Sequence, residues 1–348
     1  MCNLAGYVGK KEASGVLIDM IRRQEAFWGG YYTGIATMHD GKIDSAKLTG
    51  DLDKFLEVFG KEKFSGNIGL MHSRSKSGGG DEWAHPFLAY EGDEATLAYV
   101  ANGGMCAFMS KKAEEEAVAD RLHKSGYRLT SRIPTTHNSD YPTLSDKSAV
   151  HMSDAMCQNI LHHLKNGNTA TDAIEKAFCE LPAEIVGLAI TKEIPNGILW
   201  ARINMPMFVA FAEHGAYIAS TPFAFPDDAG EAILLPANSS GMVYSDRYTE
   251  QKFKNPPGSV AEITESVKER AYERILVLLS ESEYSFPKLE AELKALFDEA
   301  TCKPYTPLAY ATLFNMNKKG LIKFRTQRVP GVKDGLTAPK IIISLNHT

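Results

Sequence analysis

Cysteines are scarce in this sequence, and none of them is arranged in pairs. The 348 residues include five cysteines, an odd number without any Cys-x-x-Cys spacing: Cys2, Cys106, Cys157, Cys179 and Cys302. Disulfide frameworks and structural zinc sites both need paired cysteines. The pattern therefore argues against both kinds of site, and it is typical of a reducing cytoplasm.

The sequence also lacks a long apolar run. Lys10, Lys11 and Glu12 interrupt the first apolar stretch, so we expect no signal peptide. No later stretch reaches the roughly 20 apolar residues that a membrane-spanning helix needs. A hydrophobic content of 44% and a charged content of 23% are ordinary for globular proteins. We expect a cytoplasmic protein of one large or two medium domains, without membrane contact.

Positive charge is in short supply except near the C-terminal end. The chain has a formal net charge of −5. Residues 301–348 contain eight Lys or Arg and a single acid, Asp334, which gives this segment +7 and leaves −12 for residues 1–300. A basic end on an acidic body indicates a separate role for that end.

Residues 1–255 are predicted to form short strands mixed with a few helices. Stretches rich in Val, Ile, Leu and Tyr, separated by glycines, are typical of strands: 3–8, 34–38, 67–72, 96–101, 185–191, 197–203, 208–212 and 217–220. Four other stretches are predicted as helices: 15–24, 112–125, 148–166 and 171–181. Strands mixed with packed helices predict an α+β domain built in layers.

The pattern changes at the run Asn-Pro-Pro-Gly over 255–258, which is the best candidate for a domain boundary. Beyond it we expect three helices followed by two strands: 260–280, 286–299, 307–319, 321–326 and 339–345. Three helices and a two-stranded ribbon predict a small winged-helix-like domain. The sequence is therefore divided into residues 1–257 and 258–348.

Cys2 stands directly after the initiator methionine. If Met1 is removed, this residue has both a thiol and a free α-amine, which places a nucleophile beside its own base. A chain-terminal amine titrates at about 7.7–8.0, so at neutral pH it is uncharged often enough to accept the thiol's proton. Taken alone, a free cysteine is more often a small buried apolar residue. A lipid-modified cysteine would need an apolar segment before it, which this sequence lacks.

Five further segments follow Cys2 in a particular order. They are Trp-Gly-Gly-Tyr-Tyr-Thr-Gly at 28–34, His-Ser-Arg-Ser-Lys-Ser-Gly at 72–78, Trp-Ala-His-Pro-Phe at 83–87, Asn-Gly-Gly at 102–104 and Asn-Ser-Asp-Tyr-Pro-Thr at 138–143. In this order they resemble the class II glutamine amidotransferases, which are N-terminal-nucleophile hydrolases, and above all the glutaminase domain of glutamine–fructose-6-phosphate aminotransferase. The resemblance covers roughly residues 2–260 and implies a four-layer αββα sandwich.

The resemblance assigns roles to the residues that attack and bind L-glutamine. It implies that Cys2 is the nucleophile and that Arg74 pairs with the α-carboxylate, for which a planar guanidinium gives a two-pronged match. It implies that Ser77 helps to bind the same end of the substrate and that Asp140 holds the α-ammonium group. Taken alone, Arg74 is more often a surface ion pair and Asp140 a helix N-cap.

The resemblance also implies an oxyanion hole made by Asn102 and Gly103. An amide side chain and a backbone N–H would face the oxygen that becomes charged, and one such donor is worth about 3 kcal/mol in the transition state. Taken alone, an Asn-Gly pair is more often a turn. We expect a structural role for His85. The implied reaction needs no metal and no organic cofactor.

Three residues depart from the family pattern. Trp28 and Tyr31 stand where the family's Arg-Gly-Tyr-Asp-Ser run has its arginine and its acid, and Ser75 replaces a tryptophan that gates ammonia passage to a second domain. About 90 residues follow the boundary, too few for the family's sugar isomerase region with its doubly wound α/β units. We therefore expect a stand-alone domain that hydrolyses glutamine and releases ammonia, or passes it to a separate acceptor subunit.

Two alternatives remain at this point. A glutamine-responsive regulator would contact DNA or a protein partner through its basic C-terminal domain, and the +7 charge favours DNA because phosphate contacts supply most non-specific affinity. Against DNA, the third predicted helix there is mostly apolar and has base-reading candidates only late, at Asn315 and Asn317. The other alternative is a degenerate binding domain without turnover, which the presence of the residues assigned above argues against.

Overall fold

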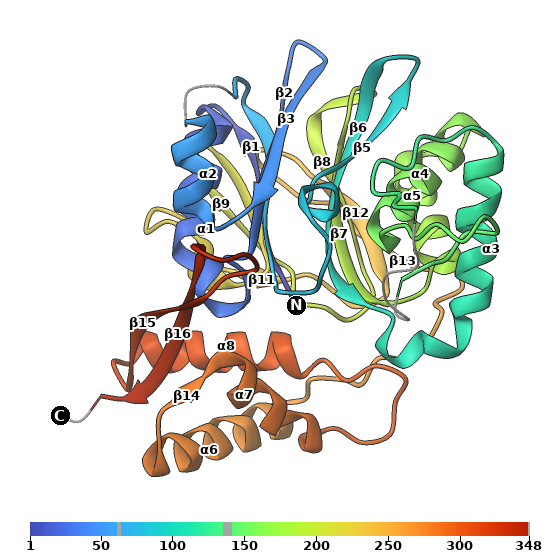
Figure 1. Ribbon diagram of the computed structural model, residues 1–348. Coiled ribbons are helices and arrows are strands. Elements are labelled where there is room, and N and C mark those ends of the chain that lie inside the picture. Colours follow the sequence, from blue (N-terminus) through green and yellow to red (C-terminus); the bar gives the residue numbers. More distant parts are fainter. Residues whose placement is uncertain (61–63, 135–140, 347–348) are drawn as a thin grey trace.

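Two β-sheets stacked face to face form the centre of the molecule (Figure 1). The structure is a computed structural model, and it describes residues 1–60, 64–134 and 141–346. Within these residues the first sheet has seven strands, in the order β11 (Ile233–Leu234), β9 (Phe208–Ala212), β10 (Gly215–Ala219), β1 (Asn3–Gly9), β4 (Ile68–Arg74), β2 (Tyr32–His39) and β3 (Lys42–Thr49). The second has six, in the order β13 (Gln251–Lys252), β12 (Ser239–Val243), β8 (Ile194–Arg202), β7 (Glu184–Thr191), β6 (Glu94–Gly104) and β5 (Phe87–Glu91).

Alternation along each strand supplies the apolar interior on both sides of a sheet. In β1, Leu4 and Val8 belong to the buried cluster between the two sheets, whereas Ala5 and Tyr7 belong to the cluster on the opposite face. Successive side chains of a strand point to opposite faces, so one strand contributes to two layers of the core. This is why the sequence of β1 is apolar almost throughout instead of alternating with polar residues.

Helices cover both outer faces of the stacked sheets (Figure 1). The first sheet is covered by α1 (Ala13–Trp28) and α2 (Leu52–Phe59). The second is covered by α3 (Lys112–Lys124), α4 (Met152–Lys165) and α5 (Ala170–Glu180). The order helices, sheet, sheet, helices confirms the mixed α/β architecture expected from the sequence. Within the described ranges, no helix is both long and apolar enough to cross a membrane.

Short and partly exposed elements escaped prediction. The strand β3, with the sequence Lys-Ile-Asp-Ser-Ala-Lys-Leu-Thr, is an edge strand whose outward residues are polar, so it lacks the apolar run that marks the central strands. The helix α2 has only eight residues, but its start has a recognisable cap, because the Asp51 side chain accepts a hydrogen bond from the Lys54 N–H. The strand β5 also lies at a sheet edge.

The C-terminal segment contains the three helices and two long strands that the sequence predicts, with one additional short strand. In chain order the elements are α6 (Glu265–Glu281), β14 (Tyr284–Ser285), α7 (Phe286–Ala291), the 3-10 turn η4 (Glu292–Leu296), α8 (Tyr305–Lys318), β15 (Ile322–Pro330) and β16 (Thr337–Leu345). The strands form an antiparallel sheet in the order β14-β16-β15. Figure 1 shows the helices across one end of the sandwich and the β15–β16 ribbon beside α1.

A continuous apolar core joins this segment to the sandwich. The Phe27 ring of α1 lies 5.3 Å from the Phe286 ring and 5.5 Å from the Tyr310 ring, measured between centroids. The same buried cluster contains residues of the first sheet, of α1 and of all three C-terminal helices. The predicted boundary after residue 257 is therefore crossed by shared packing, and the division into two domains stays a prediction.

This packing gives the DNA-binding alternative no support. In α8, the helix that would read DNA, Leu308, Leu313 and Met316 are buried in the shared core. Two arginines of the basic segment are engaged within the chain, Arg325 with Glu283 and Arg328 with Asp51. The apolar face of α8 is therefore occupied by the shared core, whereas Asn315 and Asn317 near its end are exposed.

Candidate active site

A pocket of about 910 Å³ lies where β1 begins and where β4 and β6 end. Cys2 precedes β1, Arg74 is the last residue of β4, and Gly103 lies at the end of β6. Antiparallel pairing of β1 with β4 places the start of one strand beside the end of the other. All three residues line the pocket, so chain segments about 100 residues apart meet there.

The side chain of Cys2 is buried in the wall of this pocket, with 8% of its surface exposed. Its backbone N–H donates a hydrogen bond to Oδ1 of Asn102 at 2.7 Å. Its Sγ lies 3.8 Å from Oγ of Ser75, and the same hydroxyl accepts a hydrogen bond from the terminal amine of Met1 at 3.4 Å. The predicted nucleophile and the start of the chain therefore both adjoin the residue that departs from the family pattern.

The surroundings of Cys2 favour its thiolate. Burial raises the pKa of the thiol, but the nearby His72, N-terminus and Arg74 together lower it to about 6. By contrast, burial raises the pKa of Cys179 to about 11. Because the thiolate is the nucleophilic form of cysteine, Cys2 has the electrostatic character of a reactive residue.

Arg74 is a buried cation that faces neutral groups. It is 1% exposed and lines the pocket. Its guanidinium donates to the Gly78 carbonyl at 2.8 Å and to the Tyr141 hydroxyl at 3.1 Å, and it lies 4.6 Å from the centre of the Tyr32 ring. Among the described residues no carboxylate forms an ion pair with it. A buried charge without a counter-ion is costly, so this arrangement is suited to a substrate that has a carboxylate.

Asn102 and Gly103 lie together at the end of β6. With Oδ1 of Asn102 bound to the Cys2 N–H, the amide Nδ2 is the end that can donate to a substrate oxygen. Gly103 has φ +149°, and a Cβ there would lie 2.0 Å from the Glu184 carbonyl oxygen of β7. The position therefore requires glycine, and Gly103 lines the pocket beside the thiol.

Ser77 and Asp140 are the two remaining residues predicted to bind the substrate. Ser77 lines the pocket, its hydroxyl donates to the Ser75 carbonyl at 3.4 Å, and its own carbonyl accepts from the Tyr141 hydroxyl at 3.4 Å. Asp140 lies outside the described residues, so its role as the ammonium ligand stays a prediction. Tyr141, which follows it in the chain, lines the pocket.

Three buried histidines lie next to one another at the pocket, and two of them, His85 and His151, line it. The ring centroids of His72 and His85 are 4.1 Å apart, and those of His85 and His151 are 5.2 Å apart. Burial lowers the pKa of His85 and of His151 well below the usual range, so these two rings are neutral at pH 7. Within the part of the chain that the structure describes, no group of three or more His, Cys, Asp or Glu could hold a metal ion.

Sequence reasoning missed three side chains of the site: His72, Tyr32 and Tyr141. His72 could have been found, because residues two apart in a strand share a face and Arg74 was already assigned. Tyr32 was harder to find, since it reaches Arg74 through the pairing of β2 with β4. Nothing in the sequence indicates that the Tyr141 hydroxyl contacts the guanidinium.

Comparison with known proteins gives relatives for most of the chain, although no family model matches it. It is 28% identical over 224 residues to glutamine–fructose-6-phosphate aminotransferase (isomerizing) of Clostridium acetobutylicum, covering 63% of the chain and 31% of that protein. The same enzyme of Pyrococcus horikoshii is 25% identical over 252 residues, which cover 72% of the chain and 37% of the relative. The chain thus spans about a third of the length of these relatives.

The chain is similar to glutamine–fructose-6-phosphate aminotransferases. Two solved structures share its fold. A glutamine phosphoribosylpyrophosphate amidotransferase from B. subtilis matches with a TM-score of 0.56 and 18% identity, over 79% of the chain and 52% of that structure. An allosteric regulatory enzyme of purine biosynthesis matches with a TM-score of 0.58 and 15% identity, over 80% and 58%. These similar proteins are named as enzymes.

Proposed function

We propose that this protein is a glutaminase-type amidotransferase, which hydrolyses the side-chain amide of L-glutamine with the Cys2 thiolate. The observation that supports this most is the meeting, in one pocket, of a thiol whose pKa is lowered to about 6 with a buried guanidinium that has no carboxylate partner among the described residues. The first is suited to attack an amide carbon, and the second to hold the carboxylate of an amino acid.

The reaction proceeds through a thioester. The sulfur of Cys2 forms a bond to the amide carbon, and the carbonyl oxygen becomes an oxyanion that faces Nδ2 of Asn102 and the backbone N–H of Gly103. The C–N bond then breaks, and the leaving nitrogen takes a proton from the α-amine of Cys2, which is free once Met1 is removed. Water attacks the glutamyl thioester, giving glutamate and restoring the thiol. No redox change occurs in either step.

Substrate binding divides between two ends of the amino acid. Arg74 pairs with the α-carboxylate, helped by Ser77, and Asp140 binds the α-ammonium group. Ammonia is released to solvent or to a separate acceptor subunit. Ser75, in place of a tryptophan, leaves a small hydroxyl beside the thiol.

The C-terminal segment acts in this proposal as a winged-helix-like support for the sandwich. Its elements follow one another as helix, strand, helix, helix, strand, strand, which is the order of a winged helix. Its third helix is buried against the sandwich, which favours a structural role over nucleic-acid recognition.

The test is glutamate release by the purified full chain, with intact mass recorded to establish the state of Met1. Wild-type protein should release glutamate from glutamine, and Cys2→Ala should lose at least about a thousandfold in kcat, as expected when a nucleophile is removed. Cys106→Ala is the matched control, because Cys106 lines the same pocket but has no assigned role. Equal activity in wild type and Cys2→Ala would exclude the mechanism.

A further inference from the structure

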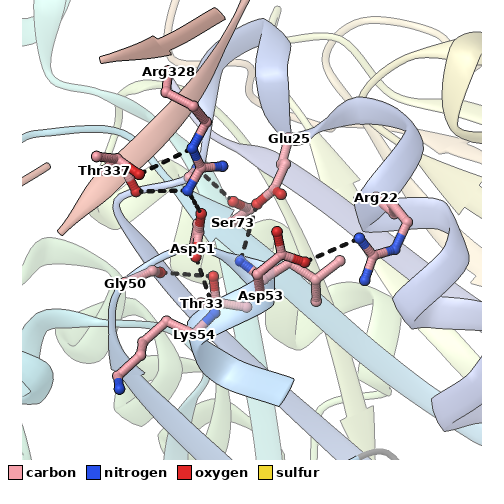
Figure 2. Close-up of polar contacts among 12 residues, drawn as sticks. Arg22, Glu25, Thr33, Gly50, Asp51, Asp53, Lys54, Ser73, Arg328 and Thr337 are labelled. Carbon is pink, nitrogen blue, oxygen red and sulfur yellow. Dashed lines mark hydrogen bonds and ion pairs between the residues drawn. The ribbon is translucent and has the colours of Figure 1, made fainter. Parts of the chain in front are cut away.

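Two residues that face each other across the strands of the C-terminal ribbon both contact the sandwich. Arg328 of β15 and Pro339 of β16 are paired in the ribbon register. Figure 2 shows Arg328 reaching Asp51, with which it forms an ion pair, while its Nε donates to Oγ1 of Thr337 at 2.9 Å. Pro339 packs on Gly30, where φ is +88° and a Cβ would lie 2.5 Å from Pro339 Cδ.

Arg328 neutralises a buried negative charge. Asp51 is 3% exposed, and it lies near the buried carboxyl of Glu25 (Figure 2). Burial, with the charges of Asp51 and Asp53, raises the pKa of Glu25 to about 8. Asp53 has its own partner in Arg22, at 3.0 Å. Removing the Arg328 charge would therefore leave Asp51 buried beside a second carboxyl group, and the segment around it would have to move or take up a proton.

Asp51 is connected to the glutamine site by short backbone contacts. It follows Gly50, whose N–H donates to the Tyr31 carbonyl at 2.8 Å and whose carbonyl accepts from Oγ1 of Thr33 at 2.9 Å. The N–H of Tyr31 in turn donates to the carbonyl of Arg74 at 3.1 Å. The turn that holds Asp51 and the turn that holds Arg74 are therefore one hydrogen-bonded unit.

A second route runs through the proline contact. Gly30, on which Pro339 packs, donates its N–H to Oγ of Ser73 at 2.7 Å, and Ser73 is the residue before Arg74. The two routes thus end at adjacent residues of β4, the first at Arg74 and the second at Ser73. These two residues determine where the guanidinium lies in the pocket.

We propose that the β15–β16 ribbon positions Arg74 for the substrate carboxylate, with Arg328 as a positioning residue that acts through Asp51. This inference rests on the proposed function, because it assigns the carboxylate of glutamine to Arg74. A displaced turn at Tyr31 shifts the backbone of Arg74 and weakens carboxylate binding. The Cys2 thiol and its oxyanion donors lie on other segments, and Arg74 makes the smallest of the contributions that lower the pKa of the thiol. The chemical step should therefore change much less than carboxylate binding.

Kinetics of the full chain test this. Arg328→Met should raise KM for glutamine at least about fivefold, while kcat stays within about twofold, which is the signature of lost ground-state binding. Arg328→Lys should restore part of the affinity because it keeps the charge. Asp51→Asn should resemble Arg328→Met, since asparagine still caps α2 but has no charge. The double variant should be no worse than either single one, because both changes break the same pair.

The matched control is Arg325→Met. Arg325 lies on the same strand and forms an ion pair with Glu283 inside the C-terminal segment. It should leave KM unchanged. If Arg328→Met and Arg325→Met behave alike, or if Arg328→Met lowers kcat and the thermal midpoint without changing KM, Arg328 is merely structural and the proposal is wrong.

A labelling ratio separates this inference from the proposed function. Cys2 is alkylated with iodoacetamide and, in parallel, with a glutamine analogue that has a diazoketone in place of the amide. Arg328→Met should lower the rate with the analogue at least about fivefold relative to iodoacetamide. If wild type releases no glutamate but Arg328→Met still lowers the ratio of the two labelling rates, turnover is absent and the positioning role is kept. If the ratio is the same in Arg328→Met and wild type, or if the analogue does not label wild type, the positioning role is wrong.

Discussion

At the scale of single residues, the site depends on charge balance around one sulfur. Cys2 is buried, which alone would suppress ionisation, yet the nearby positive groups outweigh this effect. His72 lies on the same face of β4 as Arg74, so one strand provides two of the three groups that lower the pKa of the thiol. The thiolate is thereby favoured by the same arginine that is proposed to bind the substrate.

The rate at which iodoacetamide alkylates Cys2 should depend on pH in the way that a lowered thiol pKa requires. A lowered pKa means that the thiolate is present above pH 6 and is lost as the pH falls through that value. The rate should therefore be half-maximal near pH 6 and fall about tenfold for each further unit of acidity. Mass spectrometry of digested protein measures this at each site separately. Cys179, whose pKa is raised to about 11, should stay nearly unmodified in the same range; a Cys2 midpoint above pH 8 would contradict the electrostatic argument.

Residue types in a known order allowed Cys2, Arg74, Ser77, Asn102 and Gly103 to be predicted from the sequence. The structure brings four of them to one pocket, and Asn102 lies behind it, hydrogen-bonded to the Cys2 backbone. Their assigned roles stay predictions until they are tested. Arg328 could not have been predicted in this way. Its partner Asp51 is 277 positions away, and an arginine on an exposed strand gives no sign of the buried carboxylate that it meets.

At the scale of elements, the site is made by strand ends. The central strands β1, β4 and β6 are marked by apolar runs, and the sequence predicted all three. It missed β3 and α2, because an edge strand and an eight-residue helix bury too little to leave a clear pattern. Gly50 and Asp51 lie between these two elements. The sequence therefore predicted the residues of the site but not the segment that supports Arg74.

Gly103 should be intolerant of a side chain, because the end of β6 lies against β7. Gly103→Ala should lower the free energy of unfolding by about 1–3 kcal/mol, since alanine is strained at φ +149° and its Cβ would collide with the Glu184 carbonyl. The control is Gly104→Ala, where the nearest atom to a new Cβ is the sulfur of Cys106 at 3.7 Å, an ordinary contact. Chemical denaturation measures both variants. Equal stabilities would show that β6 and β7 can separate at this end.

At the scale of the whole molecule, the C-terminal helices and the sandwich share one apolar core. The three tryptophans, Trp28, Trp83 and Trp200, all precede the predicted boundary. Tryptophan fluorescence therefore reports on the sandwich. A change in the C-terminal segment that alters tryptophan fluorescence must therefore act through the shared packing.

Leu313→Ala, in α8, should destabilise the sandwich as well as its own helix. Leu313 is fully buried in the shared core, so the substitution should lower the free energy of unfolding by about 2–5 kcal/mol. Unfolding followed by tryptophan fluorescence and by circular dichroism should shift together. Val277→Ala, at an apolar position of α6 that is 50% exposed, should change little. If Leu313→Ala left the unfolding transition measured by tryptophan fluorescence unchanged, the two parts would unfold independently.

The shared core also bears on how such a chain can change over generations. Phe27 packs against Phe286 and Tyr310. Recombination at the Pro-Pro bend would therefore join the aromatic surface of this sandwich to C-terminal helices from another protein, which do not fit it. Most hybrids made that way would expose apolar surface and aggregate. Descendants of this protein should therefore inherit both parts as a unit, with substitutions on one side of the bend matched by substitutions on the other.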